Sequence, residues 1–272
     1  MKKSISLFIL FILPIVAFAQ TYSGQIFNEK KEPLGYVNIG IVGKDIGTVS
    51  DANGYYSINI DPQFDNDSIR FSFTGYSPVS IKVADFKKQS HLINLKPQVF
   101  NLNEVVIKPI RIKRKILGNK FKVYFQAGFR DNNNGYEMGV LLKIKKRAIL
   151  HKVSIKVANC SYDSVCVRLN IYKKTGKKDF VNVLQEPIYF SWKAPKGSFT
   201  LNANLSESKW GNIVVEGNTL VTMEFIKDLG KGHLYLASGM IGATSYCRKT
   251  SQGKWKSLPV KLGISVDTEV EK

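Results

Sequence analysis

Turn-forming residues divide this chain of 272 residues into short segments along almost its whole length. Examples are the segments Glu32-Pro33-Leu34-Gly35, Asp51-Ala52-Asn53-Gly54 and Thr74-Gly75-Tyr76. Between these turns apolar and polar residues alternate, which is typical of β-strands that bury one face. The pattern therefore predicts an all-β protein rather than a helical one.

The predicted strands form two groups, and each group is large enough for a β-sandwich. In the first group, strands are predicted at residues 22–28, 37–41, 48–50, 55–60, 67–73, 80–83 and 91–95. In the second group, they are predicted at residues 139–144, 152–158, 165–172, 188–192, 197–205, 212–215, 219–225, 233–238, 243–248 and 264–266. We expect a seven-strand sandwich over residues 20–107 and a jelly-roll-like sandwich over residues 120–272. Pro109 and five cations between residues 108 and 115 predict a basic linker over residues 108–119.

The first 19 residues have the pattern of a secretory signal peptide. A basic Met1-Lys2-Lys3 precedes an apolar run, and Ala17-Phe18-Ala19 supplies the small residues that a signal peptidase prefers. We expect the mature chain to start at Gln20, to be exported, and to have no transmembrane segment after cleavage. The expected location is the periplasm, the outer membrane or the extracellular space.

Four motifs between Gly24 and Tyr76 follow one another at close spacing. They are Gly24-Gln25-Ile26, Pro33-Leu34-Gly35-Tyr36-Val37-Asn38-Ile39, the segment from Gly47 to Tyr56, and the segment from Ile69 to Tyr76. Together they resemble the carboxypeptidase-D regulatory-like domain, which has a transthyretin-like fold. The segment Leu102 to Ile107 resembles the end of this module in Gram-negative envelope proteins. The resemblance implies an accessory, non-catalytic module. The second region resembles an uncharacterised region that accompanies this module, which implies no activity.

The formal charge of +19 is distributed very unevenly. Residues 20–107 carry eight Lys and Arg against nine Asp and Glu, whereas residues 108–272 carry thirty against twelve. Strand alternation predicts that Lys152, Lys156 and Arg168 lie on an outward, cationic face. This face is either simply solvated or binds an anionic envelope component, such as lipopolysaccharide phosphate, an acidic glycan or an acidic protein. Export argues against nucleic acid as the partner.

Aromatic residues of the second region suggest an alternative role in carbohydrate binding. Trp210, Trp255 and Tyr246 lie at predicted strand ends or turns, where exposed rings stack on sugars. Trp255 lies between Lys254 and Lys256 and is expected to be the most exposed. Filling of the hydrophobic core is the other interpretation of these rings.

The cysteines and the titratable residues reveal no catalytic or metal site. Cys160 and Cys166 flank a short loop on the same non-core face, so a cross-strand disulfide is an option, as are free thiols, with Cys247 left over. His91, His151 and His233 have no partner at ligand spacing. Asp51 and Asn53 lack the later acidic residue of a calcium loop, and Asp51 is expected to form an Asx-turn. The sequence predicts no cofactor, no metal and no enzyme, with an unrecognised hydrolase as the remote alternative.

The function that these features predict is that of a non-catalytic binding or structural protein of the bacterial cell envelope. Its partner would be a protein or an anionic envelope component. Carbohydrate binding through Trp and Tyr of the second sandwich is the alternative.

Overall fold

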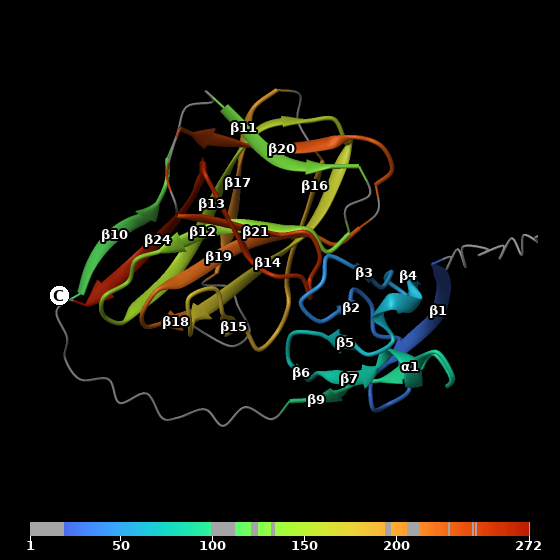
Figure 1. Ribbon diagram of the computed structural model, residues 1–272. Helices are drawn as coiled ribbons and strands as arrows, with labels where there is room; N and C mark the ends of the chain where they lie inside the picture. The colour runs from blue at the N-terminus through green and yellow to red at the C-terminus, as the bar shows by residue number, and fades with distance from the viewer. Residues whose placement is uncertain are drawn as a thin grey trace, which may run out of the picture.

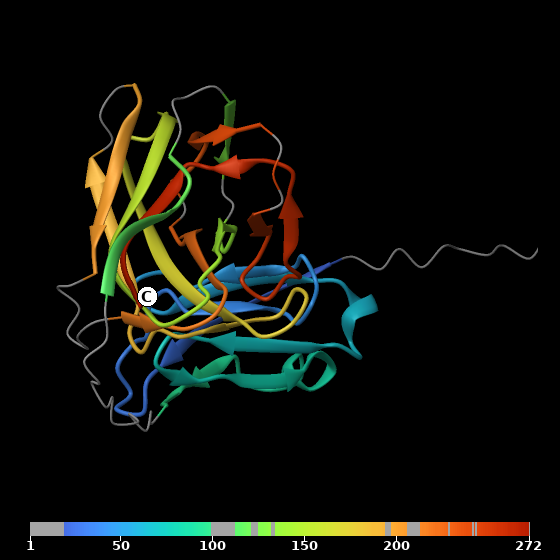
Figure 2. The ribbon, with the colours of Figure 1, turned by 90° about the vertical axis from the view of Figure 1, so that its left-hand side faces the viewer.

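A computed structural model describes residues 19–98, 112–120, 125–131, 134–193, 197–205, 213–227, 229–240, 242 and 244–271. Within these residues the chain forms two β-rich domains that lie against each other (Figures 1 and 2). The all-β prediction is confirmed: apart from the 3-10 turn η1 (Pro62–Phe64) and the short helix α1 (Val83–Phe86), every described regular element is a strand.

The first domain contains two facing sheets. One sheet has the order β4-β1-β8, and the other has the order β3-β2-β5-β7. Their strands are β1 (Gln20–Phe27), β2 (Asn38–Ile41), β3 (Gly47–Val49), β4 (Tyr55–Ile60), β5 (Ser68–Ser72), β7 (Val79–Lys82) and β8 (Leu92–Asn94). A further pair joins β6 (Tyr76–Ser77) to β9 (Lys96–Pro97). Each of the seven predicted strands is present, with ends that shift by no more than two residues.

Alternation along the strands builds the core of this domain. In β4 the side chains of Tyr56, Ile58 and Ile60 are buried, whereas their neighbours are exposed. Successive residues of a strand point to opposite faces, so one apolar face meets the apolar face of the second sheet. Ile39 and Phe71 of that second sheet belong to the same buried cluster.

The second domain is a larger sandwich of two sheets. One has the order β10-β24-β13-β20-β11, with β17 and β18 also paired to β13 and β23 to β20. The other has the order β15-β14-β19-β12-β21-β22, with β16 also paired to β14. The bounds are β10 (Ile112–Gly118), β11 (Phe125–Arg130), β12 (Glu137–Leu142), β13 (Ala148–Cys160), β14 (Ser164–Lys174), β15 (Phe180–Asn182), β16 (Ile188–Lys193), β17 (Phe199–Asn204), β18 (Ile213–Val215), β19 (Thr219–Phe225), β20 (His233–Gly239), β21 (Ser245–Arg248), β22 (Lys256–Leu258), β23 (Lys261–Leu262) and β24 (Ile264–Glu271).

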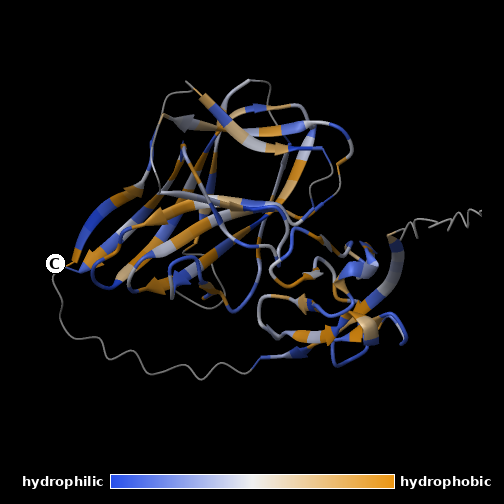
Figure 3. Ribbon diagram, in the orientation of Figure 1, coloured by the Kyte–Doolittle hydropathy of each residue, from blue (hydrophilic) through white to orange (hydrophobic). Residues whose placement is uncertain are grey.

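The core of the second domain lies between its two sheets. Val167 and Leu169 of β14 and Val153 of β13 are buried there, as their alternation predicts. Figure 3 shows the same alternation of hydrophobic and hydrophilic residues along the strands. The two-sheet sandwich of the second region is confirmed.

Part of the predicted linker is a strand. Ile112–Gly118 forms β10, which pairs antiparallel with β24 at the edge of the sheet. All but one of its side chains are exposed. A strand at a sheet edge needs no apolar face, which is why its basic sequence resembles a linker.

The two domains meet through the sheet faces that turn away from their own cores. Asn38 of β2 and Ser72 of β5 contact Arg168 of β14 and Gln252 of the second domain. The outer face of the β14 sheet is therefore covered by the first domain, and the molecule consists of stacked sheets with a polar layer in the middle.

Candidate functional site

The polar layer between the domains centres on a buried ion pair. Arg168 is 1% exposed and Glu224 is fully buried. The Arg168 Nε and Nη2 atoms donate hydrogen bonds of 3.0 and 2.9 Å to Glu224 Oε2. The same guanidinium donates across the domain boundary to the Tyr36 carbonyl oxygen at 2.7 Å and to Asn38 Oδ1 at 2.5 Å. One arginine thus bonds a neighbouring strand of its own sheet and also holds the first domain against that sheet.

A second ion pair lies beside the first. Arg248 Nε donates to Glu137 Oε2 at 2.7 Å, and Arg248 Nη2 donates to the Tyr172 hydroxyl at 2.9 Å. Asn170 joins the two pairs, because its side-chain amide donates to Glu137 Oε1 at 2.9 Å and to Glu224 Oε2 at 2.8 Å. Two cations and two carboxylates therefore form one network, which we call the interface network.

Burial and charge act in opposite directions on this network. Burial by itself lowers the pKa of Arg168, but the charge of Glu224, its hydrogen bond with Arg168 and the nearby Tyr189 and Tyr172 together outweigh burial and raise the pKa. Burial raises the pKa of Glu224, and the charge of Arg168 offsets part of that increase. Burial also raises the pKa of the Tyr172 hydroxyl well above its usual range. The guanidinium groups stay charged and Tyr172 stays neutral, so the network holds two permanent cations against two buried carboxyl groups.

The predicted cationic face of Lys152, Lys156 and Arg168 does not exist as one surface. Arg168 does point away from the core of its sandwich, but the first domain covers it. Lys152 and Lys156 lie on β13 in the opposite sheet. Lys152 is exposed and lies 3.9 Å from Asp267, which partly neutralises it.

The prediction of exposed sugar-stacking rings in the second domain is wrong for two of its three residues. Trp255 and Tyr246 are 7% and 8% exposed and pack around Phe180. Arg248 lies 4.6 Å above the Trp255 ring, a cation–π contact that holds the ring inside. Trp210 lies outside the described residues.

The two flanking cysteines do not lie on paired strands. Cys160 ends β13 opposite Leu234, whereas Cys166 lies on β14 opposite Ser191 in the other sheet. The turn between them crosses from one sheet to the other rather than closing a hairpin. Cys160, Cys166 and Cys247 are all free thiols in this structure.

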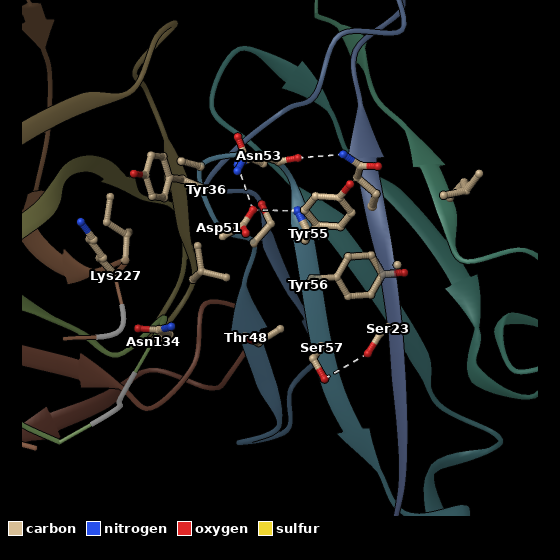
Figure 4. Close-up of a pocket in the computed structure, with 17 residues that line it drawn as sticks. Ser23, Tyr36, Thr48, Asp51, Asn53, Tyr55, Tyr56, Ser57, Asn134 and Lys227 are labelled. Carbon is tan, nitrogen blue, oxygen red and sulfur yellow. Dashed lines mark hydrogen bonds between the residues drawn. The ribbon is translucent and has the colours of Figure 1, made fainter. Parts of the chain in front are cut away.

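An open groove runs along the domain boundary beside the interface network (Figure 4). Its volume is about 920 Å³. The first domain contributes most of its lining, namely Ser23, Gly24, Gln25, Tyr36, Thr48, Val49, Ser50, Asp51, Ala52, Asn53, Tyr55, Tyr56, Ser57 and Leu92. Asn134 and Lys227 of the second domain lie on the opposite side (Figure 4), and Ile226 also lines the groove. We call this hollow the interdomain groove.

The chemistry of the interdomain groove is largely neutral and hydrogen-bonding. Tyr55 is 56% exposed, and Ser23 and Ser57 are joined by a side-chain hydrogen bond of 3.3 Å. Asn134 Oδ1 is buried and has no hydrogen-bond partner among the described residues. Asp51 and Lys227 are the only charged residues among the described lining. Such a surface suits a ligand with many hydroxyl groups and apolar faces.

A tight turn shapes this groove. Asp51 Oδ1 accepts hydrogen bonds of 2.9 Å from the backbone amides of Asn53 and Tyr55. The predicted Asx-turn is therefore confirmed. Gly54 has φ of 78°, the left-handed conformation that glycine adopts without strain. The turn brings Asn53 and Tyr55 to the rim of the groove.

Tyr36 links the groove to the interface network. Its φ is 60°, which is uncommon for a residue with a Cβ atom. Its backbone amide donates to the Asp51 carbonyl at 3.1 Å, and its own carbonyl accepts from Arg168. The same residue also contributes to the wall of the groove.

Sequence reasoning assigned the groove residues only structural roles. Alternation in β4 could have placed Tyr55 and Ser57 on an outward face, but nothing in the sequence shows that the second domain faces them. Within the described residues, no group of three or more His, Cys, Asp or Glu side chains could hold a metal ion. The described helices include none long and apolar enough to cross a membrane.

Residues 22–107 match the sequence model of the CarboxypepD_reg-like domain family. This confirms the resemblance of the N-terminal motifs, and the regulatory-like domain is a non-catalytic one. A search of curated proteins finds no match.

Comparison with solved structures finds likenesses of low sequence identity, and two of them are the following. The cysteine protease and lectin-like domains of Cwp84, a surface layer associated protein of Clostridium difficile, align with 94% of this chain at 8% identity and a TM-score of 0.40. This chain spans 60% of the length of that one. The infectious bursal disease virus VP2 subviral particle aligns at 8% identity over 94% of this chain and 66% of its own, with a TM-score of 0.16. Neither score indicates a shared fold.

Proposed function

We propose that this protein is a non-catalytic binding protein of the bacterial cell envelope, and that it binds a neutral saccharide in the interdomain groove. The observation that carries the proposal is the exposed Tyr55 ring, which lies among hydroxyl and amide side chains at the boundary of two domains. The match of residues 22–107 to a non-catalytic accessory family supports a binding rather than a catalytic role.

The groove lining supports a sugar better than a charged ligand. An aromatic ring contacts the C–H face of a pyranose, while amide and hydroxyl groups bond its hydroxyls. Asn134 Oδ1 is a buried acceptor without a partner in the described chain, and a sugar hydroxyl would supply the missing donor. The volume of the groove, about 920 Å³, is large enough for more than one sugar unit.

Titration calorimetry of the mature chain with a panel of neutral oligosaccharides tests this proposal. We expect binding that persists at high salt and that Tyr55→Ala weakens by about tenfold, because ring stacking does not depend on ionic strength. Phe125→Ala is the matched control, since Phe125 is an exposed ring outside the groove. Lack of binding to every neutral glycan, or equal binding by Tyr55→Ala, would overturn the saccharide proposal.

Export to the envelope is the second part of the proposal. It rests on the signal-peptide pattern of residues 1–19. Expression of the full chain in a Gram-negative host, followed by fractionation and N-terminal sequencing, tests it. We expect a product outside the cytoplasm that begins at Gln20. An uncleaved chain in the cytoplasm would contradict export.

A second candidate ligand is an anionic envelope component, which would bind to the β13 sheet of the second domain. Lys120 and Lys156 line a hollow of about 270 Å³ together with Ser154, Thr200 and Ser265, and no carboxylate is among its described lining. Binding there would be electrostatic and would weaken as salt increases. Calorimetry of Lys156→Gln with lipopolysaccharide distinguishes this site from the interdomain groove, because the variant should weaken binding only at this hollow.

A further inference from the structure

A second, smaller hollow lies within the polar layer between the domains. Its volume is about 220 Å³. The first domain contributes Arg70, Ser72 and Thr74, and the second contributes Asn182, Arg248 and Ser251 among others. None of its lining residues belongs to the interdomain groove. We call this hollow the interface cavity.

Two donors that face this cavity have no partner. Arg70 Nε and Ser251 Oγ are buried, and neither makes a hydrogen bond within the described part of the chain. Arg70 is on β5 in the first domain, and Ser251, only 2% exposed, is in the second. Buried polar groups are normally satisfied, so two unsatisfied groups beside one cavity indicate that something else occupies it.

The charge of the cavity lining is positive. Arg70 and Arg248 line the cavity, and no described carboxylate does. The carboxylates of Glu137 and Glu224 are already matched by Arg248 and Arg168. Arg70 forms no ion pair with any described residue, so it supplies an excess positive charge at this point.

We propose that the interface cavity binds an oxyanion of the phosphate class, and that Arg70 and Ser251 are its donors. Arginine is well suited to this role because its planar guanidinium donates two parallel hydrogen bonds to phosphate oxygens. The cavity volume corresponds to a phosphate group with a few waters, given a water volume of about 30 Å³. The phosphate group is either free or a substituent on a sugar or lipid.

The position of the cavity gives the anion a structural consequence. Its two donors come from different domains, so one bound phosphate joins the domains at a place where they otherwise leave donors unpaired. A ligand that binds only the docked arrangement stabilises it by an amount that rises with the logarithm of ligand concentration once the site is mostly filled. We therefore expect phosphate to raise the melting temperature of the whole chain.

Calorimetry and thermal melting of the mature chain with inorganic phosphate, at constant ionic strength, test the site. We expect saturable binding, a rise in melting temperature, and affinity that falls by about tenfold or more in Arg70→Gln. Ser251→Ala should weaken phosphate binding to a smaller extent. Because this change removes only a hydroxyl group without a partner in the described part of the chain, the variant should fold, and it tests the site even if Arg70→Gln does not fold. Glucose 6-phosphate separates the sources: tighter binding than inorganic phosphate indicates a phosphate carried on a sugar.

One control variant makes a similar change in charge at another place. Lys82→Gln alters an exposed lysine on the neighbouring strand β7 and should bind phosphate as the wild type does. Three results would overturn the proposal: no saturable binding, wild-type affinity in both Arg70→Gln and Ser251→Ala, or loss of binding in Lys156→Gln, which would place the anion in the hollow on β13.

Discussion

At the scale of single residues, Arg168 has the largest consequence for the molecule. Its guanidinium bonds a buried carboxylate in its own domain and two oxygen atoms of the other domain. A polar residue at an outward strand position would ordinarily belong to a solvated surface. Here the outward position is the centre of a domain boundary.

Replacement of Arg168 by methionine should lower the free energy of unfolding of the second domain by about 3–5 kcal/mol, because Glu224 would be left as an uncompensated buried charge in that domain. Urea denaturation followed by fluorescence measures this change. Arg114→Met is the control, since Arg114 pairs with Glu269 at the surface, and it should have almost no effect. A small loss in Arg168→Met would show that the buried pair is not formed.

Buried tyrosines make the protein sensitive to alkali. Burial raises the pKa of Tyr56 and of Tyr172 above the usual value of 10.0. These tyrosines ionise near pH 10.0 in the unfolded chain and only at higher pH in the folded chain. Their contribution to the free energy of unfolding is therefore complete below pH 10.0 and is lost as the pH rises above that value. Absorbance at 295 nm should show these tyrosines ionising only as the chain unfolds. Reversible ionisation of every tyrosine near pH 10 in the folded protein would contradict this prediction.

The sequence predicts well on which face of a strand a side chain lies, but it predicts poorly whether another part of the chain covers that face. Alternation placed Arg168 off the core face of β14, and this is correct, because its guanidinium contacts the first domain instead of the core. It could not show that a second domain covers that face, since burial by a distant segment leaves no periodic signal in the strand itself. The same limit explains why Trp255 was expected at the surface.

At the scale of elements, the turn between β3 and β4 shows how local sequence controls the shape of the interdomain groove. Gly54 combines a left-handed conformation with close packing: a Cβ atom there would lie 2.6 Å from the Ile26 carbonyl oxygen. The sequence predicts this turn from Asn53-Gly54, because few residues other than glycine adopt positive φ readily.

Gly54→Ala should therefore destabilise the protein by more than the roughly 1–2 kcal/mol that a left-handed residue costs by itself. Gly217→Ala is a matched control, because Gly217 has φ of 80° and no atom within 4 Å of the added Cβ. Thermal denaturation of both variants separates backbone strain from steric clash. Equal losses would show that the close approach to Ile26 relaxes without cost.

Strands at sheet edges were the elements most difficult to predict. β10 and β22 have few buried side chains, so neither carries an alternating apolar pattern. Both are held mainly by backbone pairing to β24 and β21. Strands with one apolar face, such as β4 and β14, were predicted almost to the residue.

At the scale of the whole molecule, the interface network makes the two domains dependent on each other. Undocking would remove the two hydrogen bonds that the buried Arg168 donates to Tyr36 and Asn38 of the first domain and would expose its ion pair with Glu224. The two-domain organisation followed from the sequence, because each domain has its own alternating strands. Their docking did not, because it depends on side chains more than 100 residues apart, such as Asn38 and Arg168.

We expect the wild-type mature chain to unfold in a single calorimetric transition. Loss of the shared contacts in Arg168→Met should separate it into two transitions, one for each domain. Differential scanning calorimetry measures this directly. Two transitions in the wild type would show that the domains unfold independently.

The positions of the first and last described strands determine how the molecule responds to mechanical load. β1 lies between β4 and β8, and β24 lies between β10 and β13, so each is held by backbone ladders on both sides. Tension applied at residues 20 and 271 therefore acts at each end on a strand that two ladders hold. The domains are joined largely by side-chain contacts instead, so we expect a stretched chain to separate at the domain boundary before either sandwich unfolds.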